Sequence, residues 1–119
     1  MAQIDDTIAT YLTAIEVEGK TENTVLSYRA SLEDFRRVGR RLGFPDAVDD
    51  YEVVHVYEFL GDLKERGASP AYRHRRHREV KTFFSWCRRM DYVADNVFAK
   101  VALVKLDQQI RPPFSPDEI

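Results

Sequence analysis

The sequence contains very little cysteine. Cys87 is the single cysteine among 119 residues, which excludes an intrachain disulfide and a zinc site built from several thiolates. One free thiol fits a reducing cytoplasm, and that is the location we expect. Long hydrophobic runs are missing too, because no stretch approaches the roughly 20 apolar residues that a membrane-spanning helix needs. With 44% hydrophobic residues, the composition indicates a soluble domain with a core of its own.

The charges nearly balance over the whole chain but not along it. The net charge is −2, yet residues 20–41 carry +3 and residues 68–90 carry +6, so the remainder carries −11. Such asymmetry lets a protein of modest pI present a locally positive surface. Two basic segments in one small domain favour a polyanionic partner. The alternative is that each segment is the solvated face of an ordinary amphipathic helix.

Apolar residues recur every three or four positions in four segments, and no segment alternates with a period of two. This spacing predicts an all-α domain. Capping residues and glycines mark the ends of the segments. We expect helices that begin at Asp5 or Asp6, at Thr21, after Asp49–Asp50 and at Ser69–Pro70, the first three ending at Gly19, Gly43 and Gly67. A short fifth helix is expected around residues 94–103.

The apolar side of each expected helix forms the candidate core. The four stripes are Ile8, Tyr11, Leu12 and Ile15; Val25, Tyr28, Leu32, Phe35 and Leu42; Val53, Val56, Tyr57, Leu60 and Leu63; and His77, Val80, Phe83, Phe84 and Cys87. Trp86 lies at the edge of the last stripe and is expected to pack in the core.

The last sixteen residues differ in character from the rest. Residues 104–114 contain Pro112–Pro113, which cannot continue a helix, and they predict an extended linker. Residues 115–119 combine a serine cap, a proline at the first position and acids in the first turn, the pattern of a helix start. We therefore interpret residues 1–103 as one domain and residues 115–119 as the first residues of another.

The polar sides of the second and fourth helices carry residue types that bind nucleic acids. Arginine, threonine, serine and asparagine hydrogen-bond phosphates and base edges. Opposite the core stripe, the fourth helix presents Arg75, Arg78, Thr82 and Arg89, and the second presents Asn23, Ser27, Ala30, Arg37 and Arg41.

Several motifs resemble the core-binding (SAM-like) domain of tyrosine recombinases, the phage integrase family. The run Thr21–Arg29 (TENTVLSYR), with Leu32 and Phe35 after it, resembles that domain's second helix. Val80–Lys81 with Phe83–Cys87 (FFSWC) resembles the fourth helix, and Asp91–Asn96 (DYVADN) resembles the turn that follows. The resemblance covers nearly the whole chain in the right order. Val97 stands where the family usually has proline, and Cys87 where leucine is usual.

The resemblance implies a fold and a function. Such domains are bundles of four or five helices arranged as two crossed hairpins, and they form half of a C-shaped clamp around a recombination half-site. The implied partners are double-stranded DNA and other recombinase protomers in a synaptic complex, with the isolated domain monomeric and no membrane involved. Carried over residue by residue, the implied DNA-binding residues are Lys20, Asn23, Thr24, Ser27, Arg29, Arg75, Arg78, Lys81 and Thr82.

The resemblance also implies that catalysis resides elsewhere. The family's arginine, histidine, lysine and tyrosine act in a second domain, which would follow Ile119, so we expect this chain to lack activity and the full-length protein to exchange DNA strands. We expect no cofactor. We expect no metal either, because His55, His74 and His77 lack metal-ligand spacing as a set.

Two other functions fit the same residues. A helical protein-interaction domain would bind an acidic partner through the same basic faces. A helix-turn-helix repressor is disfavoured, because the connection between the third and fourth helices lacks the short helix pair of that motif. A DNA partner predicts a steep dependence of affinity on salt, and a protein partner a shallower one.

Overall fold

Four α-helices make up most of the computed structural model, which describes residues 2–105. They are α1 (Ile4–Val17), α2 (Glu22–Leu42), α3 (Val53–Glu65) and α4 (Pro70–Arg89), with short 3-10 helices at η1 (Val48–Asp50) and η2 (Val97–Lys100). Within the described residues there is no strand beyond an isolated bridge between Gln3 and Ala47. The predicted all-α class is confirmed. Over the same range, no helix is both long and apolar enough to cross a membrane.

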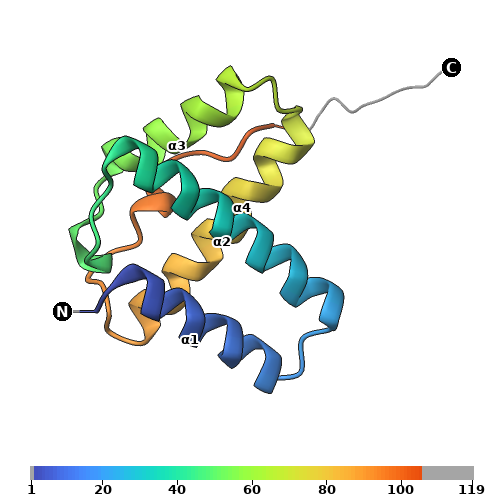
Figure 1. The fold of residues 1–119 in the computed structure, drawn as a ribbon, viewed down its shortest axis with the longest axis vertical. Coiled ribbons are helices and arrows are strands. Elements are labelled where there is room, and N and C mark those ends of the chain that lie inside the picture. The colour runs from blue at the N-terminus through green and yellow to red at the C-terminus, as the bar shows by residue number, and fades with distance from the viewer. Residues whose placement is uncertain (1, 106–119) are drawn as a thin grey trace, which may run out of the picture.

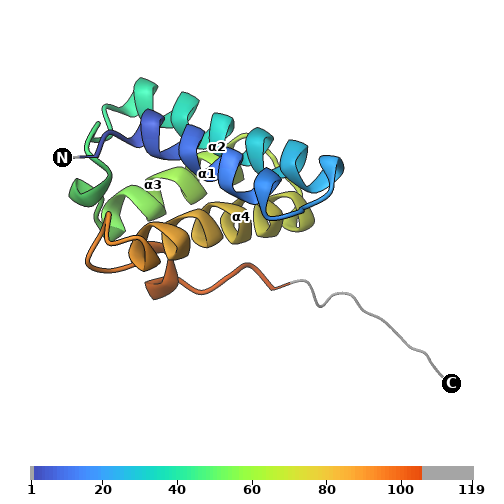
Figure 2. The same ribbon diagram turned by 90° about the horizontal axis from the view of Figure 1, so that it is seen from below.

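The helices form two hairpins that cross. Helices α1 and α2 lie side by side in one layer, and α3 and α4 form the layer behind them (Figures 1 and 2). Helix α2 passes over α4 near the middle of both helices, so their N-terminal halves diverge from the crossing (Figure 1). This arrangement confirms the predicted bundle of two crossed hairpins.

Two helix starts follow the predicted caps closely. The hydroxyl of Thr21 accepts a hydrogen bond from the backbone N–H of Thr24 at 3.2 Å and begins α2. The hydroxyl of Ser69 accepts from the N–H of Tyr72 at 3.1 Å, and Pro70 occupies the first position of α4. Both caps satisfy N–H groups that have no partner inside the helix.

The start of α1 differs from the prediction. Neither Asp5 nor Asp6 caps this helix, which begins at Ile4. The N–H of Ile4 donates to the carbonyl of Asp46 at 2.7 Å, so a loop distant in sequence takes the place of a side-chain cap. Asp5 instead pairs with Arg36 of α2, with 2.7 Å between Oδ1 and Nε.

The expected α-helix over residues 94–103 is wrong: only the 3-10 turn η2 forms there. The Asn96 side chain accepts from the N–H of Phe98 at 3.0 Å and donates to the Lys81 carbonyl and the Ser85 hydroxyl at 3.0 and 2.8 Å. These bonds tie the segment to α4, and they direct the fully buried Phe98 into the core. The linker predicted for residues 104–114 lies outside the described residues from residue 106 onward, and so does the helix start predicted for residues 115–119.

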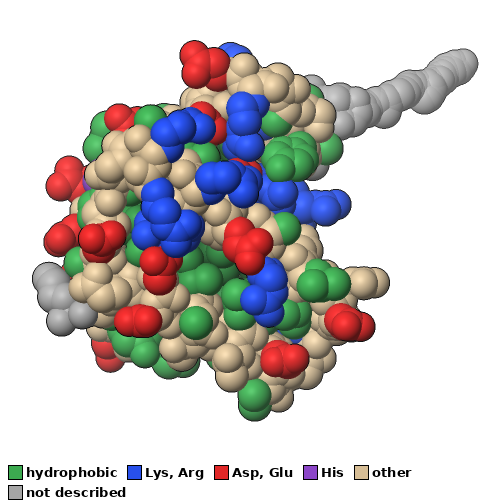
Figure 3. All heavy atoms as spheres, in the orientation of Figure 1, with side chains coloured by type: hydrophobic (Ala, Val, Ile, Leu, Met, Phe, Trp, Pro, Cys, Tyr) green, Lys and Arg blue, Asp and Glu red, His purple; other side chains and the backbone are tan. Residues whose placement is uncertain are grey.

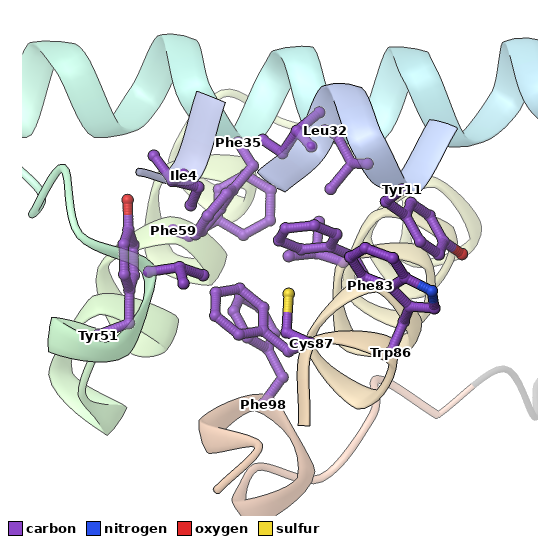
Figure 4. Packing of buried hydrophobic residues seen from close by; sticks show 14 of the residues in the cluster. Ile4, Tyr11, Leu32, Phe35, Tyr51, Phe59, Phe83, Trp86, Cys87 and Phe98 are labelled. Carbon is purple, nitrogen blue, oxygen red and sulfur yellow. The ribbon is translucent and has the colours of Figure 1, made fainter. Parts of the chain in front are cut away.

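Phe35 of α2 lies at the centre of the core (Figure 4). Its ring centroid is within 6.1 Å of five other aromatic rings, those of Phe44, Tyr51, Phe59, Phe84 and Phe98. The Phe59 ring is nearest, at 5.1 Å and almost perpendicular, which is a favoured geometry for aromatic pairs. These rings come from the connection between α2 and α3, from α3 and α4 and from η2, so Phe35 of α2 joins the two layers.

The core face of α3 is rotated from the predicted one. Phe59 is fully buried although the predicted stripe omitted it, and Tyr57, which the stripe included, is 59% exposed. On α2, Leu42 is 46% exposed, because the last turn of that helix extends beyond the core. Trp86 is 5% exposed and packs against Tyr11, which confirms its predicted place in the core.

The residue after α4's last turn offers a simple test of the fold. Asp91 has φ = 64°, in the left-handed region that glycine adopts without steric cost. Replacing Asp91 with glycine also removes a negative charge at a helix C-terminus. We expect Asp91→Gly to raise the free energy of unfolding by up to about 1 kcal/mol, measured by urea denaturation. The opposite substitution, Gly43→Ala at φ = 78°, should lower it, and an unstable Asp91→Gly variant would contradict the assigned turn.

His77 predicts how stability depends on pH. The ring is fully buried beside Phe98, and burial lowers its pKa below the ordinary value. The unfolded chain therefore binds a proton near pH 6.5 that the folded chain does not, so stability is complete above that pH and is lost as the pH falls through it. We expect the free energy of unfolding to be lower at pH 5.5 than at pH 7.5, and the difference to shrink in His77→Leu. An equal difference in that variant would assign the effect to another group.

Candidate nucleic-acid interface

The outer face of α4 carries positive charge that is not closely paired with carboxylates. Arg75 and Arg78 are exposed, and Thr82, one turn after Arg78, is half-buried. Arg78 has only a loose contact, 3.9 Å from its Nη2 to Oε2 of Glu79, and within the described residues Arg75 forms no ion pair. The Thr82 hydroxyl donates to the Arg78 carbonyl of the same helix at 2.9 Å. Both guanidinium groups are therefore free to bind an anion.

The beginning of α2 presents a second group of predicted residues. Lys20, Asn23 and Arg29 are exposed. Thr24 is half-buried, and its hydroxyl accepts a hydrogen bond from that of Thr21 at 2.9 Å. The backbone cap and this hydroxyl pair fix the first turn of α2, so Asn23 occupies a defined position at the helix start.

Two of the predicted residues are already engaged within the protein. Ser27 donates to Oε2 of Glu79 at 2.7 Å and so belongs to the contact between α2 and α4. Lys81 is half-buried, and its carbonyl accepts from Asn96. The chain from Asn96 to Val104 covers the flank of α4 that carries Lys81. This cover reaches His74, whose Nδ1 lies 2.9 Å from the carbonyl of Val104. The structure therefore leaves a narrower open sector on α4 than the isolated helix would have.

Two buried carboxylates lie where α2 crosses α4. The Glu79 side chain is 3% exposed and accepts from the hydroxyls of Ser27 and Ser31 at 2.7 and 2.5 Å. The Asp34 side chain is 1% exposed and accepts from Arg76 of α4, with 3.3 Å between Oδ2 and Nε. Hydrogen bonds of this kind offset the cost of removing a carboxylate from water.

Arg76 connects these groups. It donates to the Ser31 hydroxyl at 3.0 Å and to the Tyr72 hydroxyl at 2.7 Å, and its guanidinium lies 4.4 Å from the centroid of the Tyr72 ring. All of these contacts hold Arg76 against the protein. Arg76 is thus a structural residue, although it lies in the most basic segment of the sequence.

Four arginines of α2 are paired with carboxylates, and three of these pairs reach other helices. Arg36 and Arg40 bind Asp5 of α1, and the hydrogen bond from Arg36 holds the pKa of Asp5 below its usual value. Arg37 binds Asp34 within α2, and Arg41 binds Asp62 of α3. Much of the positive charge of residues 20–41 is therefore offset in space. Even so, Lys and Arg side chains gather around the crossing of α2 and α4 (Figure 3).

Within residues 2–105, no group of three or more His, Cys, Asp and Glu side chains is arranged to hold a metal ion.

The fold is similar to part of a known DNA-bound protein. Over 89% of its length the chain superposes on lambda integrase in two crystal structures of dimers bound to a COC′ core site, one of a fragment, each with a TM-score of 0.76. The sequences are 15% and 16% identical, so the similarity concerns the fold. The chain spans 37% and 29% of the two integrase chains. No protein-family model and no curated protein matches the sequence.

Sequence reasoning missed the buried carboxylates. Asp34 and Glu79 were counted only as charges inside basic segments, but each lies on its helix beside the apolar stripe. The signal was local: Ser27, Ser31 and Asp34 follow one another at four- and three-residue spacing, which places them on one side of α2. Such a polar row next to a core stripe indicates a helix contact.

Asp34 tests whether the crossing depends on these ion pairs. Asp34→Ala leaves the guanidinium of Arg76, whose side chain is 13% exposed, without its charge partner. We expect the free energy of unfolding to fall by about 3 kcal/mol, measured by urea denaturation. Glu33→Ala is the matched control, since it removes the same charge from the preceding position, which is exposed. It should change the free energy of unfolding by less than about 0.5 kcal/mol. Equal effects would mean that the pairs around Asp34 stabilise nothing.

Proposed function

We propose that this chain is the DNA-binding module of a site-specific tyrosine recombinase, and that it clamps one face of a recombination half-site through α2 and α4. The observation that carries the proposal is the pair of free arginines, Arg75 and Arg78, on a fold shared with part of lambda integrase. In that protein's structures the dimer is bound to DNA.

The residues divide into two roles. Arg75 and Arg78 are the candidates for base contacts, because the fork of a guanidinium can pair with a guanine edge through two hydrogen bonds. Lys20, Asn23, Thr24 and Arg29 lie near the start of α2, where contacts with phosphates would set the orientation of the duplex. Ser27, Lys81 and Thr82 contribute at the edge of this surface, since each also makes a bond inside the domain.

The chain by itself is proposed to be inactive. In this family a tyrosine of a second domain forms the covalent bond to DNA. Tyr11 and Tyr51 are buried in the core, and burial raises the pKa of Tyr51 to about 12, which opposes formation of a nucleophilic phenolate. The remaining tyrosines do not match the family's catalytic motif. Strand exchange, the synaptic complex and a monomeric state of this domain alone all belong to the proposal.

A protein-binding function remains the second candidate. The same arginines would contact acidic side chains of a partner. The two functions differ in how affinity responds to salt, because only a nucleic acid releases a large population of condensed counterions on binding.

The first experiment measures the salt dependence of DNA binding. Fluorescence anisotropy of the 119-residue chain with duplexes of about 30 base pairs should show log affinity falling linearly with log salt concentration. In Arg75→Ala/Arg78→Ala we expect weaker binding and a slope smaller by about two, because a guanidinium group in the major groove also neutralises phosphate charge beside it.

A matched control separates this surface from net charge alone. Arg40→Ala/Lys100→Ala removes two exposed positive charges away from the outer face of α4 and should keep most of the slope. If the chain does not bind at about 50 mM salt, the proposed function is wrong. If both double variants behave alike, α4 is not the contact surface.

A further inference from the structure

Four arginines surround one buried and one largely buried carboxylate on the side of α2 that faces α3. We call this set the arginine cluster; its members are Arg37, Arg41, Arg66 and Arg76, with Asp34 and Asp62 between them.

Each carboxylate is shared by several guanidinium groups. Oδ2 of Asp34 lies 3.1 Å from Nη2 of Arg66 and its Oδ1 lies 2.8 Å from Nη2 of Arg37. Asp62 lies 3.0 Å from Nε of Arg66 and also pairs with Arg41. Arg66 therefore bridges the two carboxylates and joins α2 to α3, and Arg76 connects α4 to the same network through Asp34.

The positive charges of the cluster outnumber its negative charges. Four guanidinium groups face two carboxylates, which leaves a surplus of two positive charges. The surplus lies outermost, because the side chains of Arg37 and Arg41 are 67% and 57% exposed. Each has five N–H donors and uses one nitrogen in these pairs, so donors are left to bind a ligand.

Stability does not account for the two outer arginines. Exposed ion pairs contribute between about 0 and 1 kcal/mol, and Arg66 and Arg76 already provide Asp34 with partners. The buried carboxylates instead hold the outer guanidinium groups in fixed positions, which lowers the entropy lost when they bind a ligand. A fixed pair of guanidinium groups with free donors matches an anion such as a phosphate.

The length of α2 identifies the kind of anion. Its 21 residues make a helix about 31 Å long, whereas the major groove of B-DNA is about 12 Å wide. A helix laid across that groove reaches the phosphate backbones on both sides. Asn23 lies in the first turn of α2, and Arg37 and Arg41 lie in its C-terminal half, about 21 Å or more from it.

We propose that Arg37 and Arg41 are a second phosphate-binding point, which contacts the duplex strand on the far side of the groove from the start of α2. This proposal rests on the proposed function, because it assumes duplex DNA as the ligand. The contact supplies affinity and orientation and does not read bases.

The test uses Arg37→Ala/Arg41→Ala in the same anisotropy measurement on duplexes of unrelated sequence. We expect affinity to fall on all duplexes alike and the salt slope to decrease by about two. Arg37→Lys/Arg41→Lys keeps the charges and should retain most of the slope. Urea denaturation of the alanine variant should show a nearly unchanged midpoint, since Asp34 keeps Arg66 and Arg76 and Asp62 keeps Arg66.

The outcomes separate this proposal from the one it rests on. If the unmodified chain fails to bind duplex DNA, both are wrong. If it binds, and Arg37→Ala/Arg41→Ala matches the charge control Arg40→Ala/Lys100→Ala in affinity and slope, the second phosphate-binding point is wrong and the proposed function stands. A lost slope that the lysine variant does not restore would also overturn it, because a phosphate contact depends on charge.

Discussion

The crossing of α2 over α4 depends on two consecutive residues that face different surroundings. Phe35 points into the aromatic core and contacts rings of α3 and η2, while Asp34, one position earlier, points toward Arg76 and Arg66. Neighbouring residues of a helix point about 100° apart, so one turn of α2 joins an apolar contact to an ionic one. Burial of the rings favours the contact of the two layers, and the Asp34–Arg76 pair lies between α2 and α4 at the same crossing.

This division explains how an acidic protein can present a basic surface. Much of the positive charge of α2 is paired with acids of α1 and α3, while the outer face of α4 has no such partner among the described residues. The net charge of −2 describes neither region. What matters to a polyanion is the number of guanidinium groups left with free donors, and that number follows from the packing of the helices.

The four helices could be predicted because their signals are local. Thr21 and Ser69 cap helices through bonds that span three residues, and the apolar stripes need only the helical repeat. Two of the failures involve partners distant in sequence. Asp46 takes the place of a cap for α1, and Asn96 fastens η2 to α4.

The candidate site shows the same limit. Helical geometry correctly placed Arg75 and Arg78 on an open face, because exposure follows from the position of the core stripe. It could not show that Ser27 binds Glu79, or that Arg76 binds Asp34 and Ser31, since those pairs exist only once α2 and α4 meet. A sequence therefore indicates which side chains face outward better than it indicates which of them remain free.

The segment that follows η2 sets a steric limit on any duplex. Helix α2 covers one flank of α4, and the chain from Asn96 to Val104 covers the other. A bare helix, 10–12 Å across, just fills a major groove about 12 Å wide. Because α2 and the segment from Asn96 to Val104 lie beside α4, the combined surface is too wide for α4 to reach the floor of a major groove. Under the proposed function, base pairs would therefore be reached only by the tips of long side chains such as those of Arg75 and Arg78.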